Sequence, residues 1–158
     1  PNLKGILTTG NFIDQTTPVD KPVSEKLIDY ISLFEDAYQR DANGILLRPA
    51  AFYSMFTQKS TTEEYTLPFG VTIEGGVARV LGVPIFTTTA LNSTDIVVGD
   101  WANGAQLLTQ EAMRVEFFAQ DGDNVTTNKV TIRVEGNYAL PVYGSDYFIK
   151  GTTATATS

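Results

Sequence analysis

The apolar positions change period along the chain, and this change predicts a fold of mixed helices and strands. From Ser24 to Arg40 they recur at the spacing of one stripe of an amphipathic helix. We expect the Ser24 hydroxyl to cap the first turn and Asp36 to form an ion pair with Arg40 near the end. The segment therefore predicts one long helix that buries a single side. The members of the stripe are Leu27, Ile31, Phe34 and Tyr38.

Short apolar segments follow that helix. Ile45–Leu47 is a continuous apolar run, which predicts a buried strand. Pro49 fits the first turn of a short helix that continues to Lys59, because the missing N–H of proline costs nothing there. Pro68 and Gly70 interrupt the next stretch, so we expect a loop or an edge strand. Further strands are predicted at residues 77–80, 83–88 and 95–98, and from 106 to 142.

Two alternating segments, residues 115–118 and 128–135, lie on either side of an acidic turn. Their alternation is typical of half-buried strands. The turn begins with Asp121-Gly122, and an Asp-Gly pair predicts a tight hairpin without any ligand. A calcium loop would need carboxylates at set positions and a closing bidentate Glu, which this segment lacks. The pattern therefore predicts a hairpin and no metal site.

Residue types that most enzymes use are missing. The 158 residues include no His and no Cys, which excludes Ser-His-Asp, Cys-His and thiol mechanisms within this chain. The Gly-rich stretch from Gly70 to Gly82 has neither dinucleotide nor phosphate-loop spacing. The hydrophobic content of 42% favours a packed core over disorder. We expect a protein that is not an enzyme and has no cofactor.

The charge balance is acidic. A net charge of −7 argues against a nucleic-acid-binding face. No apolar run approaches the roughly 18 residues that span a membrane. The start at Pro1 shows neither an initiator Met nor a signal peptide, so we expect a cut inside a longer protein. At the other end, the polar run Ala154–Thr157 predicts a disordered tail.

Several of these segments resemble, in their order, the C-terminal half of the major capsid proteins of tailed bacteriophages, the Hong Kong 97-type shell subunits. The likeness extends from Gly5 to Phe148. It implies an α+β, Hong Kong 97-like capsid fold, with an axial domain of a central sheet and flanking helices over residues 3–110. Residues 111–150 would be returning strands of the peripheral domain, and 151–158 a disordered tail. The matching segments are Ile45–Phe52, Leu81–Pro84, Asp95–Trp101, Gln106–Glu111 and Asn128–Glu135.

The resemblance also implies a function in assembly. The chain would be a structural subunit of an icosahedral phage or prophage capsid, forming pentamers and hexamers that enclose DNA. Its partners would be other copies of itself, with scaffold or portal proteins as further ones, and neither a specific nucleic-acid sequence nor a membrane. Its place would be the virion capsid, assembled in the cytoplasm of the host bacterium. Host and triangulation number stay open.

Two residues fall where some members of that family carry an autocatalytic crosslink. Asn128 and Glu135 match the Asn and the catalytic Glu of a Lys–Asn bond between subunits. Positions seven apart lie on opposite faces of a regular strand, so a bulge or a partner chain would have to bring them together. We therefore expect both residues to have structural roles in the turn and the strand.

Two other interpretations remain open. An encapsulin-like shell protein would share the fold and differ in cargo, so the contents of intact particles would distinguish it. A non-catalytic phage tail or carbohydrate-binding module built mainly of strands belongs to a different class. The helix predicted from Ser24 to Arg40 argues against this second alternative.

Overall fold

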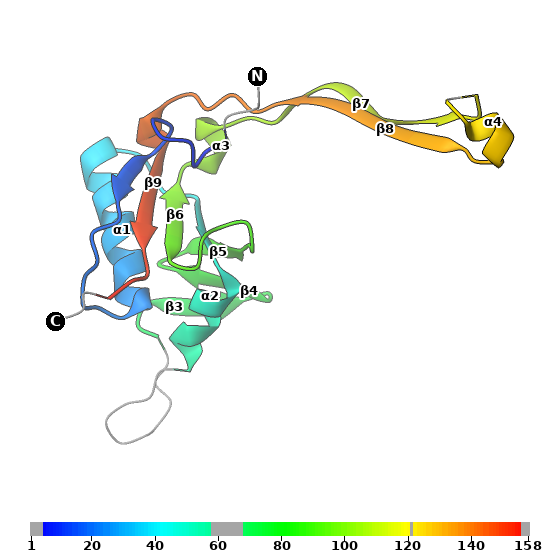
Figure 1. Cartoon of the computed structure of the whole chain (residues 1–158). Helices are drawn as coiled ribbons and strands as arrows, with labels where there is room; N and C mark the ends of the chain where they lie inside the picture. The colour runs from blue at the N-terminus through cyan, green and yellow to red at the C-terminus, as the bar shows by residue number, and fades with distance from the viewer. Residues whose placement is uncertain (1–4, 58–67, 121, 156–158) are drawn as a thin grey trace. The chain divides into compact units, whose positions relative to one another are not determined.

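The computed structural model describes residues 5–57, 68–120 and 122–155. The chain divides into two compact units, and each is described by itself (Figure 1). The first, which we call the sheet unit, contains Lys4–Ala105 and Val142–Ser158. The second contains Gln106–Pro141, and we call it the ribbon unit. No helix of the described residues is long and apolar enough to cross a membrane.

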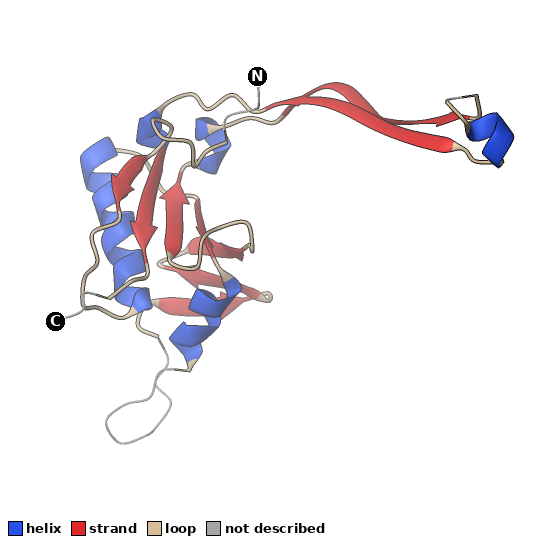
Figure 2. Cartoon of the chain, viewed as in Figure 1, coloured by secondary structure: helices blue, strands red, loops and turns tan. Residues whose placement is uncertain are grey.

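A seven-stranded mixed sheet forms the centre of the sheet unit. Its strand order is β1-β9-β6-β2-β5-β4-β3. The pairs β1–β9 and β2–β5 are parallel and the other neighbours are antiparallel. Parallel and antiparallel pairs are thus mixed in one sheet, and its strands β3 to β6 follow one another along the chain without a helix between them (Figure 2). The strands are β1 Ile13–Gln15, β2 Gly44–Leu47, β3 Val71–Glu74, β4 Val77–Val80, β5 Val83–Thr87, β6 Asp95–Gly99 and β9 Phe148–Thr152.

Two helices, α1 (Val23–Tyr38) and α2 (Pro49–Phe56), pack on the larger core of this sheet. The predicted stripe on α1 is confirmed, because three of its residues are buried there and Tyr38 packs against them. Pro49 is the first residue of α2, as its fixed backbone angle predicts. The buried stripe residues are Leu27, Ile31 and Phe34.

The ends of α1 differ from the prediction. The helix begins at Val23 with Pro22 as its N-cap, so Ser24 lies inside the first turn, buried, and no side chain caps the helix. Arg40 forms its ion pair with Asp146, at 2.9 Å, rather than with Asp36. It also lies over the ring of Tyr147, with 3.9 Å between the guanidinium carbon and the ring centroid. Helix spacing favoured a local partner, whereas the fold supplies one that is 106 positions away.

A second, smaller core contains Leu91, Val97 and Phe148. The short helix α3 (Trp101–Gly104) borders it, and its Trp101 ring meets Phe148 edge to face at 5.0 Å. The indole N–H donates to the carbonyl of Gly44 at 3.0 Å. Trp101 is thus a partly buried core aromatic with a satisfied polar atom.

The units divide the chain at other positions than the expected boundary at residue 110. The ribbon unit ends at Pro141, and after the one-turn helix η1 (Ser145–Tyr147) the chain enters the sheet as β9, between β1 and β6. The expected disordered tail from residue 151 also differs from what is observed, because Gly151 and Thr152 belong to β9. A strand that pairs on both sides has its backbone groups satisfied, and local composition does not reveal this.

The ribbon unit contains two long antiparallel strands, β7 (Leu108–Phe118) and β8 (Thr131–Ala139). The predicted hairpin is present, but its connection is longer than a two-residue Asp-Gly turn. It includes the one-turn helix α4 (Asn124–Thr127), with Asp123 as N-cap. The Asn124 side chain closes the end of the ribbon by donating to the Phe118 carbonyl at 3.1 Å and to Thr131 Oγ1 at 2.8 Å.

Candidate assembly surface

The ribbon unit has two chemically different faces, and its register defines them. Residues directly opposite each other in an antiparallel pair point to the same side. Val115 pairs with Val134 and Phe117 with Ile132, so these four apolar side chains share one side. We call them the apolar face.

The opposite side of the ribbon is charged. Arg114 pairs with Glu135, and Glu116 pairs with Arg133, each one position out of phase with an apolar pair. Because successive side chains alternate between the two sides of a strand, these four residues lie together. We call them the charged face.

The apolar face is exposed along its length. The exposed fractions are 52% for Val115, 69% for Phe117, 61% for Ile132 and 56% for Val134. A single two-stranded hairpin is marginally stable in water unless such a face packs against something. A contiguous exposed apolar surface is typical of a protein–protein contact. The apolar face is therefore the best candidate for a surface that a partner covers.

The charged face neutralises itself. Arg114 lies 3.2 Å from carboxylate oxygens of both Glu111 and Glu135 and 3.5 Å from Glu116. The hydrogen bond to Glu135, followed by the charges of Glu111 and Glu116, raises the pKa of Arg114. Hydrogen bonds from Arg133 and then Arg114 lower the pKa of Glu135. Each charge on this face already has an opposite charge beside it.

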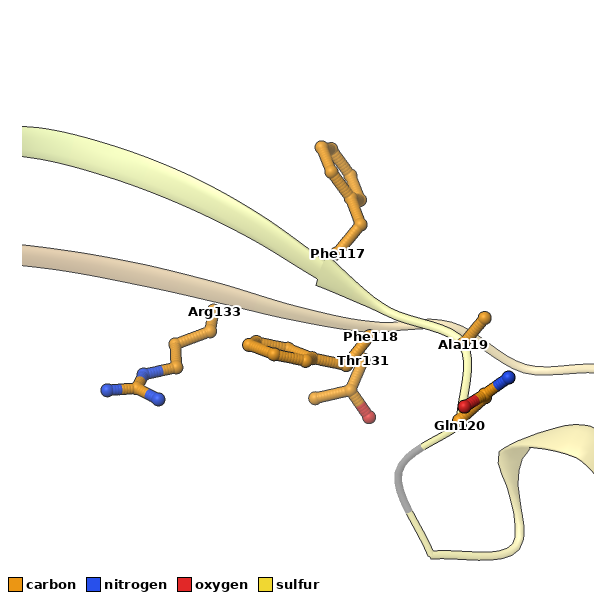
Figure 3. Close-up of a pocket in the computed structure, with 6 residues that line it drawn as sticks. All are labelled: Phe117, Phe118, Ala119, Gln120, Thr131 and Arg133. Atoms are coloured by element: carbon orange, nitrogen blue, oxygen red, sulfur yellow. The ribbon is translucent and has the colours of Figure 1, made fainter.

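A hollow of about 620 Å³ opens near the end of the ribbon. Figure 3 shows Phe117 pointing to the side opposite Phe118, Thr131 and Arg133, as the register requires. The hollow is wide open and is lined by the end of β7, the two residues after it and the start of β8. Its shape fits a protein contact better than an enclosed ligand site. Its lining is Phe117, Phe118, Ala119, Gln120, Thr131 and Arg133.

The structure separates the two residues of the crosslink hypothesis. Asn128 precedes β8 as the C-cap of α4, with a left-handed φ of 51°, and Asn tolerates this conformation better than most residues do. Glu135 lies within β8, beside Arg114 and Arg133. The expectation that both share one extended segment is wrong, because the strand begins at Thr131. A carboxylate with a lowered pKa is also a weaker base toward an incoming amine.

Acidic side chains in the sheet unit have structural partners. Asp100, which is buried, accepts from Asn43 Nδ2 at 2.5 Å and Asn103 Nδ2 at 2.7 Å. Asp95, also buried, forms an ion pair with Lys150 at 3.4 Å. Within the described ranges, no three residues of the His, Cys, Asp and Glu types are grouped as metal ligands. Asp100 thus links the start of α3 to Asn43, and Asp95 links β6 to β9.

Comparison of this chain with known proteins gives three results. The model of the phage capsid family matches residues 2–153. No curated protein sequence matches the chain. Among solved structures, the capsid of an empty GTA particle shares 12% identity with a TM-score of 0.67, over 97% of this chain and 54% of that one.

Two other solved structures are similar. A chain of Mycobacterium phage Ogopogo shares 18% identity with a TM-score of 0.60, over 87% of this chain and 54% of that one. A chain of the SrpI encapsulin complex from Synechococcus elongatus PCC 7942 shares 14% identity with a TM-score of 0.55, over 96% and 57%. These likenesses confirm the predicted α+β, Hong Kong 97-like fold. The chain spans about half the length of the solved chains it matches.

Proposed function

This chain belongs to the phage capsid family, and from that premise we propose that it is part of a structural subunit of an icosahedral capsid. The subunits assemble into pentamers and hexamers that enclose DNA. The protein is located in the virion capsid and is assembled in the cytoplasm of the host bacterium. In this proposal the sheet unit has the role of the axial domain, and the ribbon unit belongs to the peripheral domain.

One observation carries the proposal for this chain: none of the described residues of the ribbon unit covers its apolar face. Phe117 and Ile132 lie opposite each other and are each more than half exposed. Removing this area from water is favourable by about 25 cal/mol per Å² of apolar surface. A shell of identical subunits supplies a cover for such a face at every position. The partner is therefore another copy of the same protein.

The charged face supports the same partner in a different way. Its arginines and glutamates compensate each other within one ribbon, so it does not need an opposite charge from elsewhere. Exposed ion pairs of this kind contribute only about 0–1 kcal/mol each. The apolar face thus supplies the free energy of contact, while the charged face keeps the other side of the ribbon soluble. Scaffold or portal proteins are further proposed partners.

The proposal assigns the chain no catalytic step. Asn128 has a structural role at the C-cap of α4, and Glu135 has one between two arginines. We expect a boiled denaturing gel of mature particles to show single subunits. Ladders that disappear in Asn128→Asp or Glu135→Gln would instead establish the crosslink.

An encapsulin-like shell is the second candidate, and the similarity to the Synechococcus chain favours keeping it. Both candidates use the same fold, so residues of this chain do not distinguish them. The contents of purified particles do: double-stranded DNA supports the capsid, and a protein cargo supports the encapsulin-like shell.

The test is particle formation by a complete subunit that carries this chain. We expect closed particles, or rings of five or six, by sedimentation and electron microscopy. Monomer alone over a wide range of concentration and salt would contradict the function. The double variant Phe117→Ser with Ile132→Ser should abolish particles, whereas Phe117→Leu with Ile132→Val, which keeps the face apolar, should retain them. Particles from the double serine variant would exclude the apolar face as the contact while leaving the shell function intact.

A further inference from the structure

Helix α1 carries a buried ammonium group. Lys26 is only 3% exposed and lies in the second turn of the helix. Its Nζ donates to the Thr153 carbonyl at 3.0 Å and to the Ala154 carbonyl at 2.7 Å. In the described part of the chain no carboxylate forms an ion pair with it. The charge is therefore held by two backbone carbonyls just beyond β9.

The nearby acidic groups do not replace those carbonyls. Burial lowers the pKa of Lys26, and the more distant charge of Asp20 opposes this only in part. Asp29 lines the same small hollow but forms an ion pair with Lys21. Desolvation of an ammonium without a carboxylate is costly, and hydrogen bonds to carbonyls offset it incompletely. The two hydrogen bonds between Lys26 and the C-terminal segment therefore only partly offset the desolvation of the ammonium group.

A second residue of α1, Tyr30, contacts the same segment. The Tyr30 hydroxyl accepts from the Thr152 N–H at 3.0 Å, one turn beyond Lys26. Its ring lies against Gly151 so closely that a Cβ there would overlap it. Thr153 in turn donates from its backbone to the Thr94 carbonyl at 2.7 Å. Two side chains and one loop therefore hold the end of β9.

The two ends of this segment differ in burial. Phe148 and Ile149, at the start of β9, are fully buried, one in each core of the sheet unit. Thr153 and Ala154 are half-buried, and the next residue is exposed. Opening the first end breaks both cores, whereas opening the second breaks only a few hydrogen bonds. Local openings of low cost are drawn from such segments.

We propose that Thr152–Ala154 is a releasable strap on α1, and that Lys26 is its latch. The strap closes when the Lys26 ammonium meets the two carbonyls, and it opens while the rest of the sheet unit stays folded. Its release breaks the pairing of Thr152 with Asp95 in β6, whereas β1 keeps its register with Ile149–Gly151. The strap thus sets how firmly the last residues of β9 are held to α1 and β6.

Amide hydrogen exchange of the 158-residue chain, followed by NMR at neutral pH, tests the proposal. In the wild type, the Thr152 and Thr153 amides should exchange through a local opening. Their exchange rates should therefore not change at low urea concentrations. The Val98 amide, in the centre of the sheet, should exchange only by global unfolding. Identical rates and an identical urea dependence for all three amides would overturn the strap.

Two variants then test the latch. Lys26→Met should speed exchange at Thr152 and Thr153 at least tenfold. The Val98 amide should still exchange only by global unfolding of the variant. Glu35→Gln, which removes an exposed charge from the same helix, should leave all three rates unchanged. If Lys26→Met leaves the strap amides as protected as in the wild type, Lys26 is not the latch. If it does not fold, the wild-type urea series still decides whether the strap opens locally.

Discussion

Strands β6 and β7 are close in sequence but treat their apolar side chains in opposite ways. All five residues of β6 are buried. The strand lies between β9 and β2 and contributes side chains to both cores of the sheet unit. In β7, by contrast, nine of eleven residues are exposed and the other two are intermediate. Both strands have their apolar residues in a pattern that suits burial. The apolar side chains of β6 are buried within the chain, whereas those of β7 would be buried only by a partner.

This difference separates two sources of stability. The sheet unit buries its cores within the single chain, so its free energy of unfolding does not depend on a partner. The described residues of the ribbon unit have strand pairing and ion pairs but no buried core, and in the proposed assembly its apolar face would gain free energy by burial. A change in the sheet unit should therefore act on folding, and a change in the apolar face should act on association.

The largest effect is expected from Phe148→Ala in β9. Phe148 is fully buried against Trp101, so its removal should lower the free energy of unfolding by about 3–5 kcal/mol. Urea unfolding of the isolated chain measures this. The matched change Phe117→Ala on the ribbon should alter it by less than about 0.5 kcal/mol, because that side chain is exposed. Equal losses for the two variants would break the comparison.

Gly44→Ala should have the next largest effect. A Cβ at Gly44 would lie 2.6 Å from Cδ1 of the Trp101 ring, so we expect a loss of about 1–3 kcal/mol from overpacking. Combined with Trp101→Leu, the alanine should add little further loss, because the ring it meets is gone. Thermal unfolding of the two single variants and the double variant gives this coupling. Strict additivity would show that the two sites do not meet.

Lys26 predicts a pH dependence in the sheet unit. Its pKa is lowered from the ordinary value of 10.5 in the folded state, so above the lowered pKa the unfolded chain holds more protons than the folded one. Stability from this group must therefore rise with pH up to about 10.5, and its penalty is complete below the lowered pKa. The wild-type minus Lys26→Met difference in free energy of unfolding should rise over that window. A difference that falls with pH would contradict the burial of the charge.

Glu135 predicts a smaller effect in the ribbon unit, in which stability also rises with pH but over an acidic window. Hydrogen bonds from Arg133 and then Arg114 lower its pKa below the ordinary 4.5, so its contribution is present above that value. It is lost as the pH falls through the lowered pKa. An NMR titration of the carboxyl group should give a midpoint below 4.5, which moves toward 4.5 in Arg133→Gln. Arg79→Gln, in the sheet unit, is the control and should leave it in place.

Much of the sheet unit could be predicted from the sequence because its signals are local. The stripe of α1, the apolar runs at β2 and β6, and Pro49 at the start of α2 each depend on neighbours within a few positions. The place of β9 between β1 and β6 depends on segments that are far apart in the chain, since even its nearest pair with β6, Gly99 with Phe148, joins residues 49 positions apart. So does the Arg40–Asp146 pair. Local spacing favoured Asp36 for that pair because no pattern records a distant partner.

The apolar face was visible in the sequence only in part. The alternation through Phe117 and through Ile132 predicted two half-buried strands, and the exposed face follows only from their register. That register places Arg114 against Glu135 and so fixes which residues share a side. The tip was missed because the connection contains α4, whereas an Asp-Gly pair favours a tight turn; Asp121 itself lies outside the described residues. Asn128 is left outside the strand for the same reason.

Hydrogen exchange in two states tests the central claim most directly. Backbone amides of β6, β7 and β8 are followed in the isolated chain and in purified particles of the complete subunit. The account predicts fast exchange of β7 and β8 in the isolated chain, at least tenfold slower exchange of the same amides in particles, and equal protection of β6 in both. Amides of β7 and β8 that are as protected as those of β6 in the isolated chain would contradict it.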